Sequence, residues 1–199
     1  MLAEDIVKLK KQGLDILLVS SGAIALGRNG QSELNDRLAA SKGQLFLMDG
    51  WREVFASHKI DVCQVLINNG CHVDFDSLRA SNVQVVINGN DVLESTNNDF
   101  IASKVARTAH ADLLILLTNV DGYLDSNSGR VSAIDINQIR RASICSTTSE
   151  FGTGGMETKI QAIREAAITA VIANGAERAV LSRILAGEDV GTIVRRDEL

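Results

Sequence analysis

The sequence alternates short apolar runs with longer segments of helical periodicity, and this order constrains the fold more than any other feature. Apolar runs occupy residues 15–20, 62–67, 84–87 and 113–117. They are apolar on both faces, as parallel strands covered by helices are. The alternation therefore predicts an α/β protein, a three-layer α/β/α sandwich around a mostly parallel central sheet.

The segments between and around these runs predict the helices. We expect helices at 3–12, 35–56 and 99–109, a short one near 75–81, and a long one at 158–173. After the last helix we expect a strand at 179–181 and an edge strand at 192–194. A tight polar turn at 125–129 predicts a short β-hairpin, and the polar run 146–150 predicts a loop.

Length and charge narrow the class of protein. The chain has 199 residues, 45% of them hydrophobic, and no internal repeat or linker, so we expect one domain over residues 1–199. A net charge of −5 without a basic block argues against a nucleic-acid partner. No run reaches roughly 18 apolar residues, and residues 1–11 do not resemble a secretory leader. We therefore expect a cytoplasmic protein with no membrane partner.

The cysteines do not suggest a disulfide framework or a metal site. There are three, Cys63, Cys71 and Cys145, and they form no CxxC pair. In a chain without an export signal, such cysteines are expected to be buried or incidental thiols.

Ligands of doubly wound sheets bind beyond the carboxyl ends of the strands, so the loops after the apolar runs are the candidate sites. The first loop reads Ser20-Ser21-Gly22-Ala23-Ile24. Gly22 would let the backbone approach a ligand, and the following helix would offer N–H groups to an anion. An ordinary helix N-cap by Ser20 or Ser21 explains the segment equally well.

Two loops rich in Asn and Asp follow, at 88–91 and 96–99. They suit the ammonium and carboxylate groups of an amino acid, or they are simply turns and caps. Asp99 at a helix start is electrostatically favourable by itself, so its position alone does not make it catalytic. The loop 118–122 suits either a nucleotide contact or a hairpin turn.

The strongest signal is the string 151–159, which reads FGTGGMETK and precedes a clear helical pattern. Its glycines would let main-chain N–H groups turn toward phosphate oxygens, and the helix start adds partial positive charge. Lys159 would place a full positive charge where negative charge accumulates in phosphoryl transfer. The alternative is a flexible loop followed by a solvated lysine. The spacing is neither a Walker A motif nor a dinucleotide-binding fingerprint.

Taken together and in this order, these motifs resemble the glutamate 5-kinases of the amino acid kinase superfamily, over nearly the whole chain. The strings are VSSGAIALG at 19–27, INGND at 87–91, Asn98-Asp99, LLTNVDG at 116–122 and GTGGMETK at 152–159. The resemblance implies the amino acid kinase fold without its first strand. It also implies transfer of the γ-phosphoryl group of ATP to the side-chain carboxylate of glutamate, the first step toward proline, with Mg²⁺ accompanying the nucleotide.

The resemblance also assigns roles to single residues. It implies that Lys159 and Asp99 are catalytic, Lys159 by neutralising charge and Asp99 by organising the catalytic lysines. It implies glutamate contacts from Ser21, Gly22, Asp91 and Asn98. It implies no metal ligand from the protein, and it favours a homo-oligomer formed through the helix at 35–56. The ATP site would comprise Thr118, Asn119, Thr153, Gly154, Gly155, Met156, Glu157, Thr158 and Lys159.

The chain differs from the family pattern at several places. The family opens with a strand that ends in a lysine and a glycine-rich turn, and this chain begins at the helix that follows. The family's Glu-Asn-Asp reads Gly89-Asn90-Asp91, and its Thr-Asp pair reads Thr118-Asn119. The RNA-binding-like C-terminal domain of many members is not expected. An alternative hypothesis is therefore a non-catalytic homologue that acts as a nucleotide-binding or partner subunit.

Overall fold

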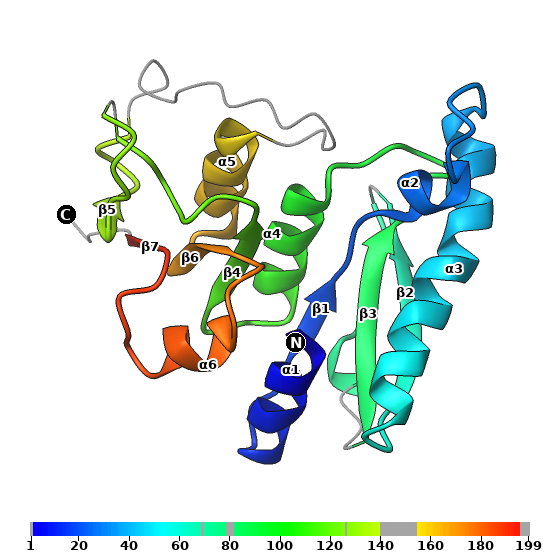
Figure 1. Cartoon of the computed structure of the whole chain (residues 1–199), viewed down its shortest axis with the longest axis horizontal. Helices are drawn as coiled ribbons and strands as arrows, with labels where there is room; N and C mark the ends of the chain where they lie inside the picture. The colour runs from blue at the N-terminus through cyan, green and yellow to red at the C-terminus, as the bar shows by residue number, and fades with distance from the viewer. Residues whose placement is uncertain (1, 69, 79–81, 126, 140–154, 196–199) are drawn as a thin grey trace. The chain divides into compact units, whose positions relative to one another are not determined.

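The computed structural model describes residues 2–68, 70–78, 82–125, 127–139 and 155–195 (Figure 1). The chain divides into two compact units. We call Lys10–Ile101 the N-terminal unit, and Met1–Leu9 with Ala102–Leu199 the C-terminal unit. The divisions fall near the end of helix α1 (Leu2–Lys11) and inside helix α4 (Asn98–Thr108). Each unit has a sheet of its own.

The sheet of the N-terminal unit has three parallel strands in the order β1-β3-β2. These are β1 (Leu17–Val19), β2 (Asp61–Ile67) and β3 (Val83–Gly89). The central strand β3 is buried from its second residue to its last, as the apolar pattern predicted. Val19 pairs with Ile87 and Ile67 pairs with Gly89, so all three strands end at the same edge.

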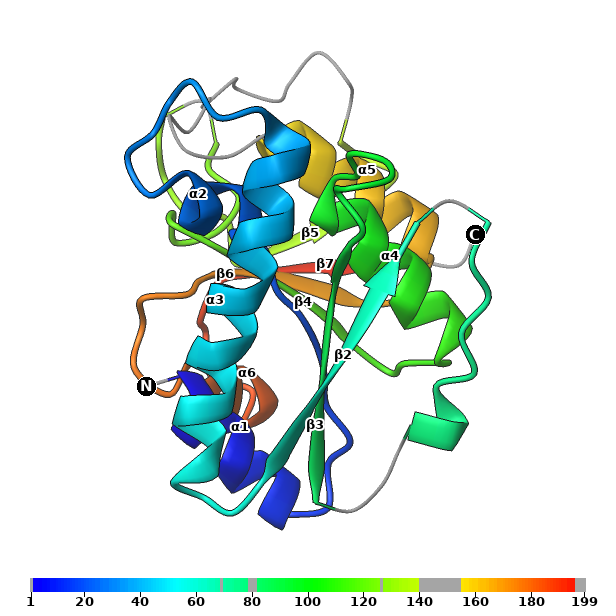
Figure 2. The same ribbon diagram turned by 90° about the vertical axis from the view of Figure 1, so that its right-hand side faces the viewer.

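Two helices of this unit, α2 (Ala23–Arg28) and α3 (Asp36–Ala56), pack against each other, and α3 also packs against β2 (Figure 2). Their crossing is close because it is made by glycines. A β-carbon on Gly27 would lie 1.8 Å from the carbonyl oxygen of Ala39, and one on Gly43 would lie 1.7 Å from that of Ala23. Neither position therefore accepts a side chain without separating the helices.

The sheet of the C-terminal unit has four strands in the order β4-β6-β7-β5. They are β4 (Leu114–Thr118), β5 (Ala133–Asp135), β6 (Ala170–Asn174) and β7 (Thr192–Arg195). β4 runs parallel to β6 and β5 runs parallel to β7, while β6 and β7 are antiparallel. An antiparallel bridge between Leu124 and Arg130 closes the hairpin predicted at 125–129.

Helix α1 is hydrogen-bonded to helix α6 (Val180–Leu185) through Asp5. The buried carboxylate of Asp5 accepts hydrogen bonds from the amides of Leu181 at 2.8 Å and Ser182 at 3.1 Å. The hydroxyl of Ser182 donates to the same carboxylate. A carboxylate at a helix start satisfies N–H groups that have no partner inside the helix.

Three predictions about the end of the chain were wrong. The helix expected at 158–173 is α5 (Met156–Ala166), which ends at the left-handed residue Ala167 (φ 56°) and is followed by β6. The strand expected at 179–181 is instead the start of α6. The strand at 192–194 exists as β7, but it lies inside the sheet, and the edge strand beside it, β5, was not predicted.

The α/β class with mostly parallel strands is confirmed, and so are the helices at 3–12, 35–56 and 99–109 to within a few residues. A 3-10 turn, η1 (Asp76–Leu78), stands where the short helix was expected. The single domain stays a prediction. Cys63 and Cys71 are free thiols, while Cys145 and the loop at 146–150 lie outside the described residues. Within the described ranges, no helix is both long and apolar enough to cross a membrane.

Candidate active site

One group of candidate site residues lies at the carboxyl edge of the sheet in the N-terminal unit. Directly after β1, the amide of Ser20 donates to the carbonyl oxygen of Ile87 at 2.8 Å. Directly after β3, the amide of Asn90 donates to the carbonyl oxygen of Ile67 at 2.8 Å. These bonds extend the ladders beyond the strands, so the turn at 20–22 and the loop at 88–91 start from the same edge.

The turn at 20–22 does not use a serine as a helix cap. The N-cap of α2 is Gly22, in the left-handed conformation (φ 106°), and within the described part of the chain no side chain caps it. Ser20 is buried and its hydroxyl accepts a hydrogen bond from the indole N–H of Trp51 at 2.9 Å. The N-cap interpretation is therefore wrong, and Ser21 and Gly22 are left exposed at the sheet edge.

The two Asn- and Asp-rich loops converge beside this turn. The side-chain oxygen of Asn98 accepts from the amide of Gly89 at 3.3 Å, which joins the start of α4 to the end of β3. A carboxylate oxygen of Asp91 accepts from the amide of Thr96 at 3.4 Å. Asp99 lies in the first turn of α4, and its amide donates to the side chain of Asn97 at 2.8 Å.

The carboxylate of Asp91 is in an unfavourable environment for its charge. Burial raises the pKa of Asp91, the hydrogen bond from the Thr96 amide lowers it, and the nearby charge of Asp36 raises it further. The net effect is a raised pKa. A cation bound next to this carboxylate would offset the loss of hydration, so the site favours a positively charged ligand group.

Asn88 is a candidate that the sequence analysis did not assign. It is the buried penultimate residue of β3, and its side-chain oxygen accepts from the amide of Gly89 at 2.8 Å. Its side-chain nitrogen has no hydrogen-bond partner among the described residues. An unsatisfied buried donor costs about 1–3 kcal/mol, so a ligand oxygen is a reasonable partner for it.

A second group of candidate residues lies at the carboxyl ends of β4 and β6 in the C-terminal unit. Thr118 pairs with Asn174, and the amide of Gly175 donates to the Thr118 carbonyl oxygen at 2.8 Å. The hydroxyl of Thr118 donates to the side chain of Asn119 at 3.4 Å. The side-chain amide of Asn174 donates to Asp121 at 3.0 Å.

Helix α5 brings the end of the glycine string to this unit. It begins at Met156, two residues before the predicted start at 158, and within the described residues its N-terminus has no side-chain cap. The connection at 167–169 is short, so α5 runs antiparallel to β6 and its start points toward the carboxyl ends of β4 and β6. α5 also packs against β4.

Lys159 lies in the first turn of α5 and is only 9% exposed. The alternative of a solvated lysine is therefore wrong for this residue. Thr158 donates its hydroxyl to the carbonyl oxygen of Gly155 at 2.8 Å, which fixes the first turn. Thr153 and Gly154, which were also predicted to contact ATP, lie outside the described residues.

The sequence profile of the amino acid kinase family matches residues 1–174, which include the candidate residues predicted from the sequence in both units. The chain belongs to the amino acid kinase family. The curated relatives that it matches include glutamate 5-kinases from several bacteria, which confirms the resemblance drawn from the motifs.

Three of these relatives give the extent of the match. The glutamate 5-kinase of Clostridium acetobutylicum is 33% identical over 96% of this chain and 84% of that protein. Those of Pelobacter propionicus and Bradyrhizobium diazoefficiens are 32% and 35% identical, over 95% and 82% of this chain. This amino acid kinase chain spans only 59% and 52% of the length of these two proteins.

Solved structures agree on the fold. UMP kinase from Bacillus anthracis superposes with a TM-score of 0.69 and 18% sequence identity, covering 99% of this chain and 86% of that one. Uridylate kinase from Archaeoglobus fulgidus superposes with a TM-score of 0.68 and 18% sequence identity, covering 97% of this chain and 90% of that one. At this identity the likeness shows the fold alone.

The residues of this amino acid kinase fit a nucleotide that brings its own metal ion. A buried lysine at the uncapped start of α5 suits a chain of phosphates. Among the residues that the structure describes, no three His, Cys, Asp or Glu side chains gather as a metal site. Mg²⁺ is commonly bound through one or two carboxylates together with substrate phosphates, which does not require such a cluster.

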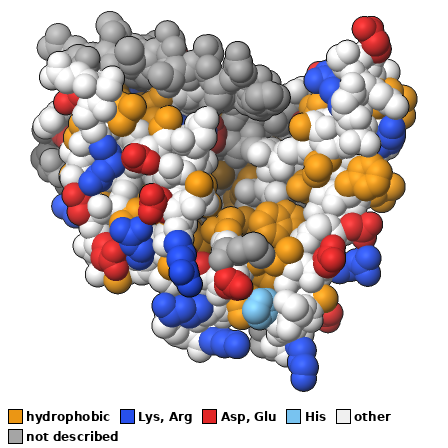
Figure 3. Space-filling model, in the orientation of Figure 1, with side chains coloured by type: hydrophobic (Ala, Val, Ile, Leu, Met, Phe, Trp, Pro, Cys, Tyr) orange, Lys and Arg blue, Asp and Glu red, His pale blue; other side chains and the backbone are white. Residues whose placement is uncertain are grey.

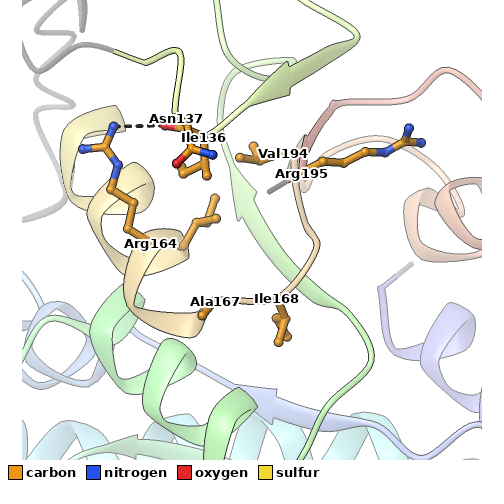
Figure 4. A pocket seen from close by; sticks show the side chains of 8 residues that line it. Ile136, Asn137, Arg164, Ala167, Ile168, Val194 and Arg195 are labelled. Atoms are coloured by element: carbon orange, nitrogen blue, oxygen red, sulfur yellow. Dashed lines mark hydrogen bonds between the residues drawn. The ribbon is translucent and has the colours of Figure 1, made fainter. Parts of the chain in front are cut away.

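A cavity of about 220 Å³ in the C-terminal unit lies elsewhere (Figure 4). Its walls include Ile136, Ile163 and Val194, and the guanidinium of Arg164 at its rim donates to the carbonyl oxygen of Ile136 at 3.2 Å. Ile136 and Val194 belong to the carboxyl ends of β5 and β7, and β7 runs opposite to β6. The cavity therefore lies at the other end of the sheet from Thr118 and Asn174.

Proposed function

We propose that this amino acid kinase transfers the γ-phosphoryl group of ATP to the side-chain carboxylate of L-glutamate, which forms glutamyl 5-phosphate in the first step of proline biosynthesis. The observation that carries the proposal is the gathering of Asp91, Asn98 and the exposed residues Ser21 and Gly22 at one sheet edge. Such a set can bind both charged groups of an amino acid. The matched glutamate 5-kinases support the same substrate.

On the acceptor side, each residue has a chemical role in this proposal. Asp91 binds the ammonium group of glutamate, which relieves the cost of its burial. The hydroxyl of Ser21 and the side-chain nitrogens of Asn88 and Asn98 donate to its carboxylates. Gly22 keeps the turn free of a side chain, so the backbone can approach the ligand.

On the donor side, the phosphates lie against the residues at 153–159, and Thr118 and Asn119 contact the rest of the nucleotide. When bound, MgATP supplies the phosphoryl group and part of the charge neutralisation. Lys159 adds a positive charge on the transferred group, and Asp99 orients the cationic side chains around it. Since phosphoryl transfer depends chiefly on alignment and neutralisation, these roles account for catalysis without a protein nucleophile.

The proposal includes a homo-oligomer formed through α3 and a cytoplasmic location. Support for the oligomer comes from large apolar side chains on the outer side of α3, visible as an apolar patch in Figure 3. Leu38, Leu45 and Phe46 are 47%, 70% and 55% exposed. Contiguous apolar surface of this kind is typical of protein contacts.

The test is glutamate-dependent release of ADP by the wild-type chain and by Lys159→Ala. We expect the variant to lose about a hundredfold or more in kcat, because it lacks a charge that acts on the transferred group. Lys8→Ala is the matched control, since Lys8 is an exposed lysine on α1. A wild-type chain that binds ATP but releases no ADP would support the non-catalytic homologue instead.

A further inference from the structure

Trp51, the one tryptophan of the sequence, connects α3 to the turn that follows β1. Its indole N–H donates to the Ser20 hydroxyl at 2.9 Å. Its ring stacks on Phe55, with 5.9 Å between the ring centroids and 28° between the planes. Because Phe55 is fully buried, the stacking fixes the indole in one orientation. The N–H donor is thus held in place before any ligand arrives.

Ser20 links Trp51 to Ser21 and Gly22, which are candidate substrate-binding residues. It is 7% exposed, its amide is bonded to Ile87 in β3, and its hydroxyl is bonded to Trp51. The next two residues, Ser21 and Gly22, are exposed, and Gly22 has the left-handed backbone that a side chain would strain. The conformation of Ser21 therefore depends on how firmly Ser20 is held.

Helix α2, which follows the turn, also packs against α3. α2 begins at Ala23 and crosses α3 at Gly27 and Gly43, where no room remains for a β-carbon. The turn is thus attached to β3 by a main-chain bond, to α3 by Trp51, and to α3 again through the glycine crossing. A contact network of this kind has little freedom to adopt a second arrangement.

We propose that Trp51 is a positioning residue for the acceptor substrate. Through the hydroxyl of Ser20, it sets the turn at 20–22 so that Ser21 and the turn backbone meet the substrate carboxylate. The inference rests on the proposed function, because it concerns the same site. Trp51 acts through Ser20, so its loss should weaken binding of the acceptor more than binding of the nucleotide.

Three variants test the coupling. Trp51→Phe keeps a ring against Phe55 and removes the N–H donor, and Ser20→Ala removes the acceptor while the main-chain bond to Ile87 remains. We expect each to raise the KM for glutamate by about tenfold, which corresponds to about 1.4 kcal/mol, with kcat and the KM for ATP changed less than twofold. The double variant should lose no more than either single variant, because both remove the same bond.

The tryptophan also reports on the turn directly. Because the chain has a single tryptophan, its fluorescence measures Trp51 alone. Glutamate should change the emission of the wild-type protein, and Ser20→Ala, which keeps the tryptophan, should show a smaller change. Additive losses in the double variant, or equal rises in the KM for glutamate and for ATP, would overturn the inference.

Hydrogen exchange separates this inference from the proposed activity. In Trp51→Phe without any ligand, the amide of Ser20, which donates to Ile87, should exchange about tenfold faster, while those of β4 in the other unit stay unchanged. Unchanged exchange at the turn would overturn the positioning role whatever the enzyme's substrate is. Faster exchange in a chain that lacks glutamate-dependent ADP release would keep the role of Trp51 and reject glutamate as the acceptor.

Discussion

Replacement of Asp91 by asparagine should weaken glutamate binding and, at the same time, stabilise the fold. The side chain keeps its size and can still accept from the Thr96 amide, but it loses its charge. A hydrogen bond to a charged group contributes about 1.5–3 kcal/mol, so loss of the ammonium contact should raise the KM for glutamate roughly 10- to 150-fold. The KM for ATP should stay within about twofold.

The effect on stability follows from the raised pKa of Asp91, which is caused first by burial. A carboxyl group whose pKa is higher in the folded than in the unfolded state binds its proton more tightly when folded. The folded state is therefore penalised as pH rises from the ordinary value of 3.8 through the raised value. Asp91→Asn removes this penalty, so it should be the more stable protein at pH 7 and lose that advantage below pH 3.8.

The assay combines ADP release at several glutamate concentrations with urea unfolding at pH 7 and in acid. In the wild type, the KM for glutamate should rise as pH falls through the raised pKa, because protonated Asp91 no longer binds an ammonium group. Asp112→Asn is the matched control, since Asp112 is an exposed acid of the C-terminal unit. An unchanged KM in Asp91→Asn would refute the assignment of Asp91 to the ammonium group.

Two further variants test the packing that supports the site. Gly27→Ala places a β-carbon 1.8 Å from the Ala39 carbonyl oxygen, so it should cost about 3 kcal/mol in urea unfolding and raise the KM for glutamate by loosening the turn before α2. Gly50→Ala, on the open side of α3, should be neutral or slightly stabilising. Asp5→Ala leaves the Leu181 and Ser182 amides without their acceptor and should cost about 2–4 kcal/mol, whereas Asp5→Asn should cost less.

The sequence predicted the fold best where periodicity and boundary residues agree. β3 is buried along nearly its whole length and ends at Gly89, while α3 begins directly after Asn35, whose side chain caps it by accepting from the amide of Leu38. The boundary between α5 and β6 was missed because apolar residues keep helical spacing from Ile160 to Val171 across it. The sequence contains no proline, and the left-handed residue that ends α5 is Ala167 rather than a glycine.

The same physical reasons explain what was predicted of the site. The loops at 88–91 and 96–99 were singled out because both are rich in Asn and Asp, and the bond from the Gly89 amide to the Asn98 side chain joins them. Asn174 and Gly175 were missed together with β6, although an Asn-Gly pair after a short apolar run is a turn signal. Ser20 was interpreted as a cap because its actual partner, Trp51, lies 31 residues away along the chain.

The two compact units divide the chemistry of the proposed reaction. The residues assigned to glutamate, Ser21, Asp91 and Asn98, belong to Lys10–Ile101, and those assigned to ATP belong to the other unit. Glutamate needs an anion for its ammonium group, which the half-buried carboxylate of Asp91 provides, whereas ATP needs cations and N–H donors, which the start of α5 and Lys159 provide. The carboxylate assigned to the ammonium group and the lysine assigned to the phosphates thus belong to different units. Asp99 is an acid assigned to the reacting groups, and because a carboxylate repels phosphates, its role must be exerted on cationic side chains rather than on the phosphates themselves.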